Sequence, residues 1–230
     1  MYMWTSIILL FGFLFYASYY IGSGVYLKAK CKLNDQNDSV ALTFDDGVDI
    51  LQTPMVLDVL KKYDVKATFF LIGSKAEQHP DIVERIIAEG HKIGIHSYSH
   101  KPIFPILSYP NMLEEVKKTK EILERISKTP ITLFRPPFGV TNPNVANVVK
   151  ELNLETIGWS IRSFDTNANV SRIEIAENVI RKIKGGDIIL LHDFYPSSVE
   201  AALKIIDQLQ PQGYVFVTVE ELFRIYGVTA

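Results

Sequence analysis

The sequence is poor in cysteine and close to neutral in charge. Cys31 is the single cysteine among 230 residues, so an internal disulfide framework and a zinc site built from cysteines are both excluded. Lysine and arginine number 24 against 26 aspartates and glutamates, which leaves a formal net charge of −2. This balance does not suggest a nucleic-acid-binding surface. We therefore expect no nucleic-acid partner, and nothing in the sequence indicates an obligate protein partner.

Charged side chains are also missing from the start of the chain. The first 27 residues contain no Asp, Glu, Lys or Arg, and residues 4–25 are dominated by Ile, Leu, Phe and Tyr. A bilayer crossing requires a span of ~20 apolar residues. A cleaved signal peptide is the alternative, but it normally has a charged start and a shorter apolar core. We predict a membrane anchor with its flank at residues 1–32, containing one transmembrane helix, and a polar linker at 33–38.

The rest of the chain, residues 39–230, alternates between short apolar runs and amphipathic segments. The apolar runs predict strands at 40–44, 67–72, 92–96, 132–134, 156–159, 188–191 and 214–217. The amphipathic segments predict helices at 54–62, 80–89, 112–126, 143–152, 173–184, 199–209 and 220–226. Near-continuous apolar strands separated by helices favour a parallel sheet covered by helices. We predict an α/β fold, a distorted (β/α) barrel of about seven βα units, which forms one catalytic domain.

The first predicted strand ends in Thr43-Phe44-Asp45-Asp46-Gly47. Two adjacent carboxylates repel each other, and in a water-poor pocket a cation must take up part of their charge. One carboxylate can then bind a metal while its neighbour keeps its lone pairs for proton transfer. Asp-Asp-Gly is also ordinary turn chemistry, so the other strand ends must decide between the two interpretations.

In α/β barrels the chemistry lies at the carboxyl ends of the strands. The third predicted strand is followed by His96 and His100, and two histidines four residues apart can bind one metal ion. With a carboxylate from a neighbouring strand they form a site that leaves open positions for water. Such a set is typical of a catalytic metal site.

Polar residues follow two further strands. Arg135 precedes two prolines that stiffen its loop, and it could hold a carboxylate ionised and oriented. His192 directly follows four apolar residues and is placed at a pocket floor. A structural arginine and a histidine satisfied at the barrel rim are the alternatives. By contrast, His79 and His91 flank predicted helices and are expected to be surface residues without a role.

Taken in order, these segments resemble the five motifs of polysaccharide deacetylases, the carbohydrate esterase family 4 or NodB homology domain. The matching segments are Thr43-Phe44-Asp45-Asp46-Gly47, His96-Ser97-Tyr98-Ser99-His100, Arg135-Pro136-Pro137-Phe138-Gly139, the stretch from Trp159 to Asp165, and Leu190-Leu191-His192. The resemblance covers about residues 38–230. It implies a distorted (β/α) barrel and a hydrolase that removes N-acetyl groups from the sugars of peptidoglycan, a chitin-like polymer or another surface glycan.

The resemblance also implies roles for the residues at the strand ends. Asp46, His96 and His100 would bind a divalent metal, most commonly Zn²⁺, with Co²⁺, Ni²⁺ or Mn²⁺ as alternatives. Asp45 would be the general base, and Arg135 would orient it. Metal-activated water would then attack the acetyl carbonyl while Asp45 accepts its proton.

The remaining roles concern the leaving group and the acetyl pocket. By the resemblance, His192 would be the general acid and Asp165 would raise its basicity. The backbone amide of Phe138 would stabilise the oxyanion, and Leu191 and Trp159 would shape the pocket for the acetyl group.

One position departs from the family pattern, because many members carry Trp where this chain has Thr166. That departure puts the wall of the acetyl pocket in doubt but not the metal or the acid–base pair. Two other functions remain open: an amide or imide hydrolase acting on a small non-sugar molecule, and a catalytically dead glycan-binding membrane protein. The intact set of acidic and basic residues argues against the dead protein.

The predicted membrane orientation rests on two conflicting signals. Lys28, Lys30 and Lys32 follow the apolar segment, and the positive-inside rule would place the domain in the cytoplasm. An N-acetylated envelope glycan lies on the other side. We expect a single-pass membrane protein with its domain on the extracytoplasmic side.

Overall fold

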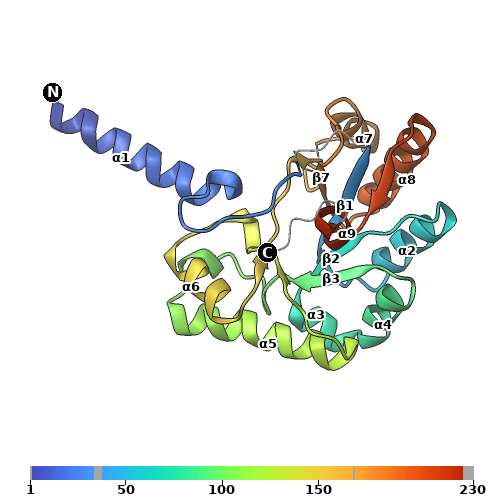
Figure 1. Cartoon of the computed structure of the whole chain (residues 1–230), viewed down its shortest axis with the longest axis horizontal. Coiled ribbons are helices and arrows are strands. Elements are labelled where there is room, and N and C mark those ends of the chain that lie inside the picture. Colours follow the sequence, from blue (N-terminus) through green and yellow to red (C-terminus); the bar gives the residue numbers. More distant parts are fainter. Residues whose placement is uncertain (1, 34–37, 168, 225–230) are drawn as a thin grey trace.

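The computed structural model describes residues 2–33, 38–167 and 169–224 and shows a parallel sheet with helices on its outside (Figure 1). The strands are β1 (Ser39–Gly47), β2 (Thr68–Leu71), β3 (Lys92–Ile95), β4 (Leu133–Phe134), β5 (Glu155–Thr156), β6 (Ile161–Arg162), β7 (Ile188–His192) and β8 (Val215–Val217). The helices are α1 (Tyr2–Tyr19), α2 (Gln52–Lys62), α3 (Gly73–Gln78), α4 (Pro80–Ala88), α5 (Tyr109–Ser127), α6 (Pro143–Glu151), α7 (Arg172–Ile180), α8 (Pro196–Leu209) and α9 (Val219–Arg224).

The sheet is a curled half-barrel and not a closed barrel. Its strands follow the order β5-β4-β3-β2-β1-β7-β6, with β8 paired to the start of β1. All these pairings are parallel, as expected for strands joined by helices. Within the described residues the end strands β5 and β6 each pair with one neighbour only. The predicted barrel therefore stays open on one side, while its parallel βα order is present.

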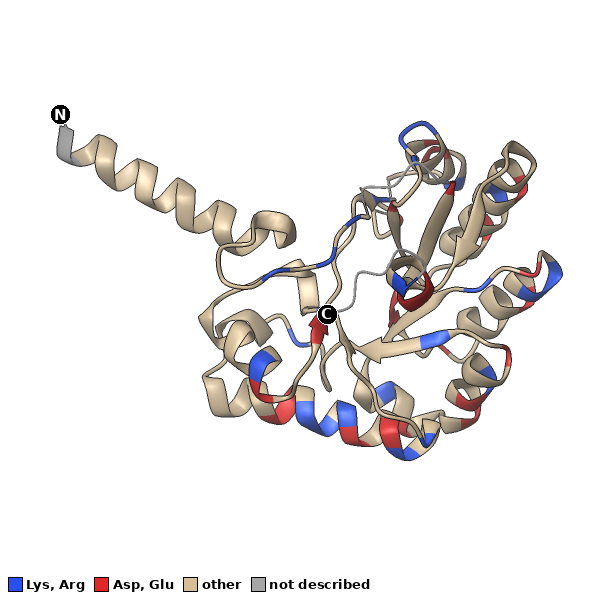
Figure 2. Ribbon diagram, viewed as in Figure 1, with Lys and Arg blue, Asp and Glu red and all other residues tan. Residues whose placement is uncertain are grey.

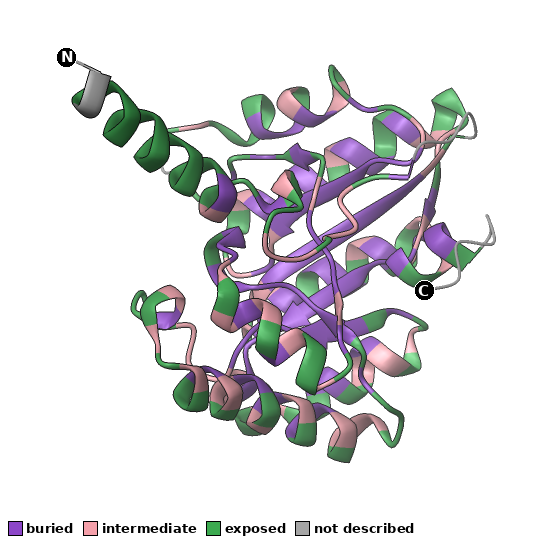
Figure 3. Cartoon of the chain, turned by 60° about the vertical axis from the view of Figure 1, so that its left-hand side comes forward, coloured by how far each residue is buried: buried purple, intermediate pink, exposed green. Residues whose placement is uncertain are grey.

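The central strand β1 is buried on both faces, which explains its continuous apolar sequence. Leu42 and Phe44 lie in the larger hydrophobic cluster, and the Phe44 ring stacks on that of Phe69 with 5.1 Å between centroids. Figure 3 shows the strands buried beneath helices whose outer faces are exposed. The strand registers align Asp45 with His192 and Ile95 with Phe134, so the carboxyl ends of these strands meet at one edge of the sheet.

Local sequence signals explain where several helices begin. Proline occupies the first turn of α4, α6 and α8, where a missing amide proton costs nothing. Asn142 caps α6 by accepting a hydrogen bond from the amide of Val145 at 2.9 Å. Ser171 and Glu174 form a capping box at the start of α7.

Two short elements were not predicted, and two predicted segments run beyond the described residues. The strand β6 has two residues, and α3 has six, which is too little for either to show a clear hydrophobic period. The predicted helix at 220–226 ends in residues outside the described range. The predicted linker at 33–38 falls mainly on residues 34–37, which also lie outside it.

The N-terminal segment does not form the predicted transmembrane helix. Among the described residues, none of the helices combines the length and the apolar character that a membrane crossing requires. Helix α1 has 18 residues, about 27 Å at the usual rise per residue. It projects away from the rest of the fold and carries no Lys, Arg, Asp or Glu (Figures 1 and 2). The predicted anchor and the predicted single-pass membrane localisation are therefore wrong.

The structural reason is that the apolar segment breaks before its predicted end. The helix stops at Tyr19, and the chain turns through a 3₁₀ segment, η1 (Ile21–Ser23), into Gly24, whose φ of 68° is left-handed. Ile21 is buried instead of being available to a bilayer. The hydroxyl of Thr141 donates a hydrogen bond to the carbonyl of Ala17 at 3.0 Å, which ties the end of α1 to the domain.

Two of the three lysines that favoured a cytoplasmic domain, Lys30 and Lys32, are engaged with the edge of the sheet. The ammonium group of Lys30 lies 2.6 Å from the carboxylate of Glu155 in β5, and that of Lys32 lies 2.8 Å from Asp187. The backbone of both lysines also forms isolated bridges, Lys30 with Ile157 and Lys32 with Asp187. Their charges therefore belong to the edge of the folded domain.

Candidate active site and metal centre

A cavity of about 240 Å³ lies where the carboxyl ends of β1, β3 and β7 meet. The structure brings most of the predicted site residues to its wall, namely Asp45, Asp46, His96, His100, Phe138, Trp159 and His192. Arg135 and Asp165 lie behind this wall and contact Asp45 and His192, respectively. The strand ends therefore form one chemical site, as their alignment in a parallel sheet requires.

The end of β1 is bent so that both carboxylates reach the same cavity. Side chains of a regular strand alternate between faces, which would separate Asp45 from Asp46. Here Asp46 has a φ of +70°, and the pairing with β2 shifts register between Asp45 and Gly47. A Cβ atom on Gly47 would lie 2.5 Å from a carboxylate oxygen of Asp193, so this position requires glycine.

Asp46, His96 and His100 form the one group of described residues with the arrangement of a metal site. Their potential ligand atoms all lie within 4.8 Å of one another. The Oδ1 atom of Asp46 is 3.3 Å from Nε2 of His96 and 3.2 Å from Nε2 of His100. Although these nitrogens are close, buried Oδ1 makes no hydrogen bond. A buried carboxylate oxygen left without a donor between two imidazoles is what a bound cation would satisfy.

A hydrogen bond to the backbone sets the orientation of the His96 ring. Its Nδ1 atom lies 2.7 Å from the backbone carbonyl oxygen of Arg135. A carbonyl only accepts hydrogen bonds, so Nδ1 donates to it and Nε2 is the ring nitrogen that faces Asp46. This is the arrangement that metal-binding histidines usually show.

Proton affinities around Asp46 also favour a cation over a proton. Burial by itself would raise the pKa of Asp46, but its interactions with His96, His100 and His192 lower that pKa well below the usual range. Burial, together with the charge of His96, lowers the pKa of His100 to about 4. Near neutral pH the site thus offers an ionised carboxylate and a neutral His100 imidazole, both able to ligate a metal.

Asp45 is paired with a buried arginine and does not join the histidines. The Nη1 atom of Arg135 donates to Oδ1 of Asp45 at 2.6 Å and to the hydroxyl of Thr43 at 2.9 Å. The remaining guanidinium nitrogens donate to the carbonyls of Ile157 and Gly158. Arg135 is fully buried, and Asp45 is its one ion-pair partner among the described residues, so the pair holds Asp45 in one orientation.

On the opposite wall, His192 at the end of β7 is paired with Asp165. The Nδ1 atom of His192 lies 2.9 Å from Oδ1 of Asp165, and the His192 amide donates to Oδ2 at 2.7 Å. Hydroxyls of Ser163 and Ser198 also donate to this carboxylate. Burial alone would raise the pKa of Asp165, but the bonds from His192 and Ser198 lower it. Nδ1 of His192 therefore holds a proton, which leaves Nε2 for the substrate.

The pKa of His192 moves in the opposite direction from that of His100. Burial would lower the pKa of His192, but the hydrogen bond and charge of Asp165, with smaller contributions from Asp45 and Asp46, raise it above its ordinary value. The raised pKa favours the protonated imidazole, the form that can deliver a proton to a leaving group.

The predicted pocket residues are only partly where the sequence placed them. The rings of Trp159 and Phe138 line the cavity, and Trp159 packs so closely on Gly139 that a Cβ there would lie 2.4 Å from the indole. Leu191 does not reach the cavity because it lies in the hydrophobic core, whereas Leu190 lines the wall. Strand alternation explains this, since Leu190 and His192 share one face of β7.

Further side chains were missed or misjudged from the sequence. Arg162 and Thr166 line the cavity, and both are exposed. Ser163 and Ser198 complete the surroundings of Asp165, but lone serines carry no sequence signal of such a role. His91 was predicted at the surface, yet it is buried, its Nδ1 accepts a hydrogen bond from the amide of Ala67, and burial lowers its pKa to about 4.

Groups that can bind a cation, accept a proton and return one to a leaving group stand around a single cavity. That combination defines the class of metal-dependent hydrolases.

The comparisons with known proteins identify the family. The family model described as polysaccharide deacetylase matches residues 32–157, and the chain belongs to this family. A peptidoglycan-N-acetylglucosamine deacetylase of Bacillus cereus is 40% identical over 190 residues, which cover 80% of this chain and 88% of the relative. The peptidoglycan-N-acetylmuramic acid deacetylase PdaC of Bacillus subtilis is 38% identical over 192 residues, covering 83% of this chain and 40% of PdaC.

A solved structure agrees with this assignment. A family 4 acetyl xylan esterase from Clostridium thermocellum, in complex with a cobalt ion, matches with a TM-score of 0.77 and 36% identity, covering 83% of this chain and 93% of that chain. The expected family and enzyme class are thus confirmed. The chain is a polysaccharide deacetylase, a hydrolase that removes acetyl groups from a glycan.

Proposed function

We propose that this chain removes the N-acetyl group from N-acetylglucosamine residues of peptidoglycan, with zinc as its metal. The 40% identity to the Bacillus cereus enzyme supports this choice of sugar. The observation that carries the chemistry is the buried, unpartnered oxygen of Asp46 between two imidazoles, beside an Asp45 that an arginine already holds. We assign this chemistry to a catalytic domain at residues 39–230.

Asp46, His96 and His100 would hold the metal, because they supply one carboxylate and two imidazoles within reach of one another. This donor set, with positions left open for water and substrate, is typical of catalytic zinc sites. When bound, the cation supplies a Lewis acid for the acetyl carbonyl and lowers the pKa of water.

Asp45 would accept the proton of the attacking water. Its Oδ1 is engaged by Arg135, and Oδ2 lies 3.9 Å from Nε2 of His96, which places Oδ2 next to the metal site. The hydrogen bond from the buried arginine prevents Asp45 from turning away. The two adjacent aspartates therefore perform different tasks.

His192 would protonate the departing amine. An amine leaves poorly unless it is protonated, and the raised pKa of His192 increases the fraction of the imidazole that carries a proton to transfer. Asp165 fixes the tautomer through Nδ1, so the proton to be transferred is on Nε2.

The acetyl group would be received by the wall formed by Phe138, Trp159 and Leu190. The backbone amide of Phe138 would contribute to stabilising the charge that develops on the carbonyl oxygen. Leu190 takes the place that the sequence had suggested for Leu191.

Acetate release by the zinc-loaded full chain tests this proposal. Peptidoglycan, chitooligosaccharides and acetyl xylan serve as parallel substrates, and mass spectrometry of muramidase digests shows which sugar carries the free amine. We expect acetate from peptidoglycan, with glucosamine as the new sugar. Free amines confined to muramic acid, or acetate from acetyl xylan alone, would contradict the proposed substrate.

A further inference from the structure

The loop that carries His100 has an unusual backbone. Between β3 and His100 the chain adopts left-handed conformations at Ser97, with a φ of +67°, and at His100 itself, with a φ of +48°. Residues other than glycine seldom adopt this region, so a loop with two such residues needs surrounding contacts that hold it. The amides of Gly73 and Ser74 donate to the carbonyls of Ser97 and Tyr98, and the Ser97 hydroxyl accepts a bond from the amide of His100.

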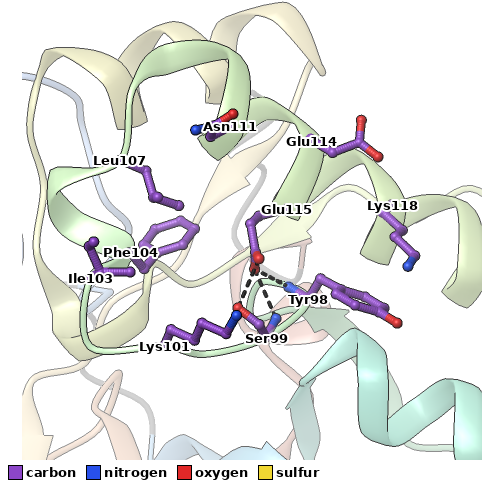
Figure 4. Close-up of a pocket in the computed structure, with 10 residues that line it drawn as sticks. All are labelled: Tyr98, Ser99, Lys101, Ile103, Phe104, Leu107, Asn111, Glu114, Glu115 and Lys118. Atoms are coloured by element: carbon purple, nitrogen blue, oxygen red, sulfur yellow. Dashed lines mark hydrogen bonds between the residues drawn. The ribbon is translucent and has the colours of Figure 1, made fainter.

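One side chain outside the active-site cavity provides three further contacts. The carboxylate of Glu115 extends from α5 to this loop, where Oε2 accepts hydrogen bonds from the backbone amides of Tyr98 at 3.1 Å and Ser99 at 2.8 Å (Figure 4). Its Oε1 accepts a third bond from the hydroxyl of Ser99 at 2.8 Å. A carboxylate has enough lone pairs for all three donors. Glu115 therefore fixes the two residues that immediately precede His100.

Glu115 is presented from a well-packed helix. One turn further along α5, Thr119 donates to the carbonyl of Glu115 at 2.9 Å. A Cβ on Gly73 would lie 2.5 Å from the Thr119 hydroxyl, so α5 and α3 are in close contact there. The position of the Glu115 carboxylate is thus determined by the core of the domain.

The two predicted histidine ligands differ in how they are oriented. His96 extends from the buried strand end, and its Nδ1 donates to the carbonyl of Arg135. For Nδ1 of His100, no hydrogen-bond partner is found in the part of the chain that the structure describes. Its ring contacts the ring of His96, at 4.9 Å between centroids, and that of Phe138, at 4.8 Å. The placement of His100 consequently depends on its loop.

We propose that Glu115 is a positioning residue for His100 and that it thereby sets the affinity of the site for its metal. This inference rests on the proposed function, which makes His100 a metal ligand. Groups that orient metal ligands typically change metal affinity or activity by ~10–100-fold when removed. Neither the family motifs nor the cavity wall includes Glu115, since its carboxylate approaches the loop from the other side.

The chain offers a matched control for this role. Glu114 precedes Glu115 on α5, and both line a second cavity of about 410 Å³, separate from the active-site cavity. In Figure 4 the Glu114 side chain points away from the loop, and no hydrogen bond of its carboxylate is found among the described residues. Glu114→Ala removes the same charge from the same helix without touching the His100 loop.

The test is zinc affinity, measured by competition with a chromophoric chelator on the full chain. We expect Glu115→Ala to weaken binding at least tenfold, Glu115→Gln to recover part of that loss through its amide oxygen, and Glu114→Ala to stay within twofold of the wild type. Thermal unfolding of the metal-free variants checks that each one folds. The Co²⁺ absorption spectrum should change for Glu115→Ala only, because the spectrum reports the ligand geometry.

A double-mutant cycle with His100→Ala sharpens the test. If Glu115 acts through His100, Glu115→Ala should have no further effect on zinc affinity once the imidazole is gone. Additive losses, or equal losses for Glu115→Ala and Glu114→Ala, would overturn the proposal. A wild-type chain that binds no zinc would instead overturn the proposed metal site and this inference with it.

Discussion

Two histidine–aspartate arrangements lie at the cavity, and they differ in the number of hydrogen bonds that the carboxylate accepts. Asp165 accepts four hydrogen bonds: two from His192 and one each from the hydroxyls of Ser163 and Ser198. Oδ1 of Asp46 lies 3.3 Å from Nε2 of His96 and 3.2 Å from Nε2 of His100, yet this buried oxygen accepts no hydrogen bond. The residue types are the same, and only the surroundings differ.

The histidines reflect this difference in their affinity for protons. His192, beside the saturated carboxylate, has a raised pKa, whereas the pKa of His100 falls to about 4. A carboxylate fixed by several donors keeps a proton on its histidine. One left unsatisfied between two imidazoles is suited to a cation.

Of the changes to the His192–Asp165 pair, removing His192 should lower the deacetylation rate most. We expect His192→Ala to lower deacetylation by about 100-fold or more, because the amine loses its proton donor. Zinc content should stay unchanged, since the metal side is intact. The sign follows from the raised pKa: His192 is protonated below that pKa and loses its proton as the pH rises, so activity of the wild type should fall at alkaline pH.

The variant should therefore lose the alkaline limb of the pH–rate profile. His79→Ala is the control, because it removes an imidazole at the start of α4, outside the cavity. It should keep both the rate and the limb. An alkaline limb that persists in His192→Ala would show that another group donates the proton.

Replacing Asp165 should lower the deacetylation rate less than removing His192, and it tests how the carboxylate affects the pKa of its histidine. Asp165→Asn keeps the shape of the partner but removes the charge that raises the pKa of His192. Without that charge the pKa of His192 should fall, so a smaller fraction of the imidazole carries a proton at a given alkaline pH. The alkaline limb should move to lower pH while the zinc content stays the same, as rates measured across a pH series would show. An unshifted limb would contradict the role given to the Asp165 charge.

The sequence was sufficient to bring residues to one cavity where they lie at the ends of long apolar strands. Asp45, Asp46 and His192 lie in the last residues of β1 and β7, so the rule for parallel α/β sheets placed them at one cavity. The rule does not say which residues of a strand face the cavity and which face the core. For that reason Leu191 was chosen where Leu190 lines the cavity.

The sequence was insufficient where a role depends on a single distant contact. Glu115 and Ser198 reach the site across the fold from positions that look like ordinary helix residues. The apolar N-terminal segment was misjudged for a related reason. Composition alone does not show that it turns at Gly24 and buries Ile21 against the domain.

The most direct test of the division of labour between the two aspartates is the zinc content of the purified full chain carrying Asp45→Asn or Asp46→Asn. We expect Asp45→Asn to keep zinc at the wild-type level while losing nearly all turnover, and Asp46→Asn to lose the zinc. Loss of zinc from Asp45→Asn, or retention of zinc by Asp46→Asn, would contradict the assignment of one aspartate to the proton and the other to the metal.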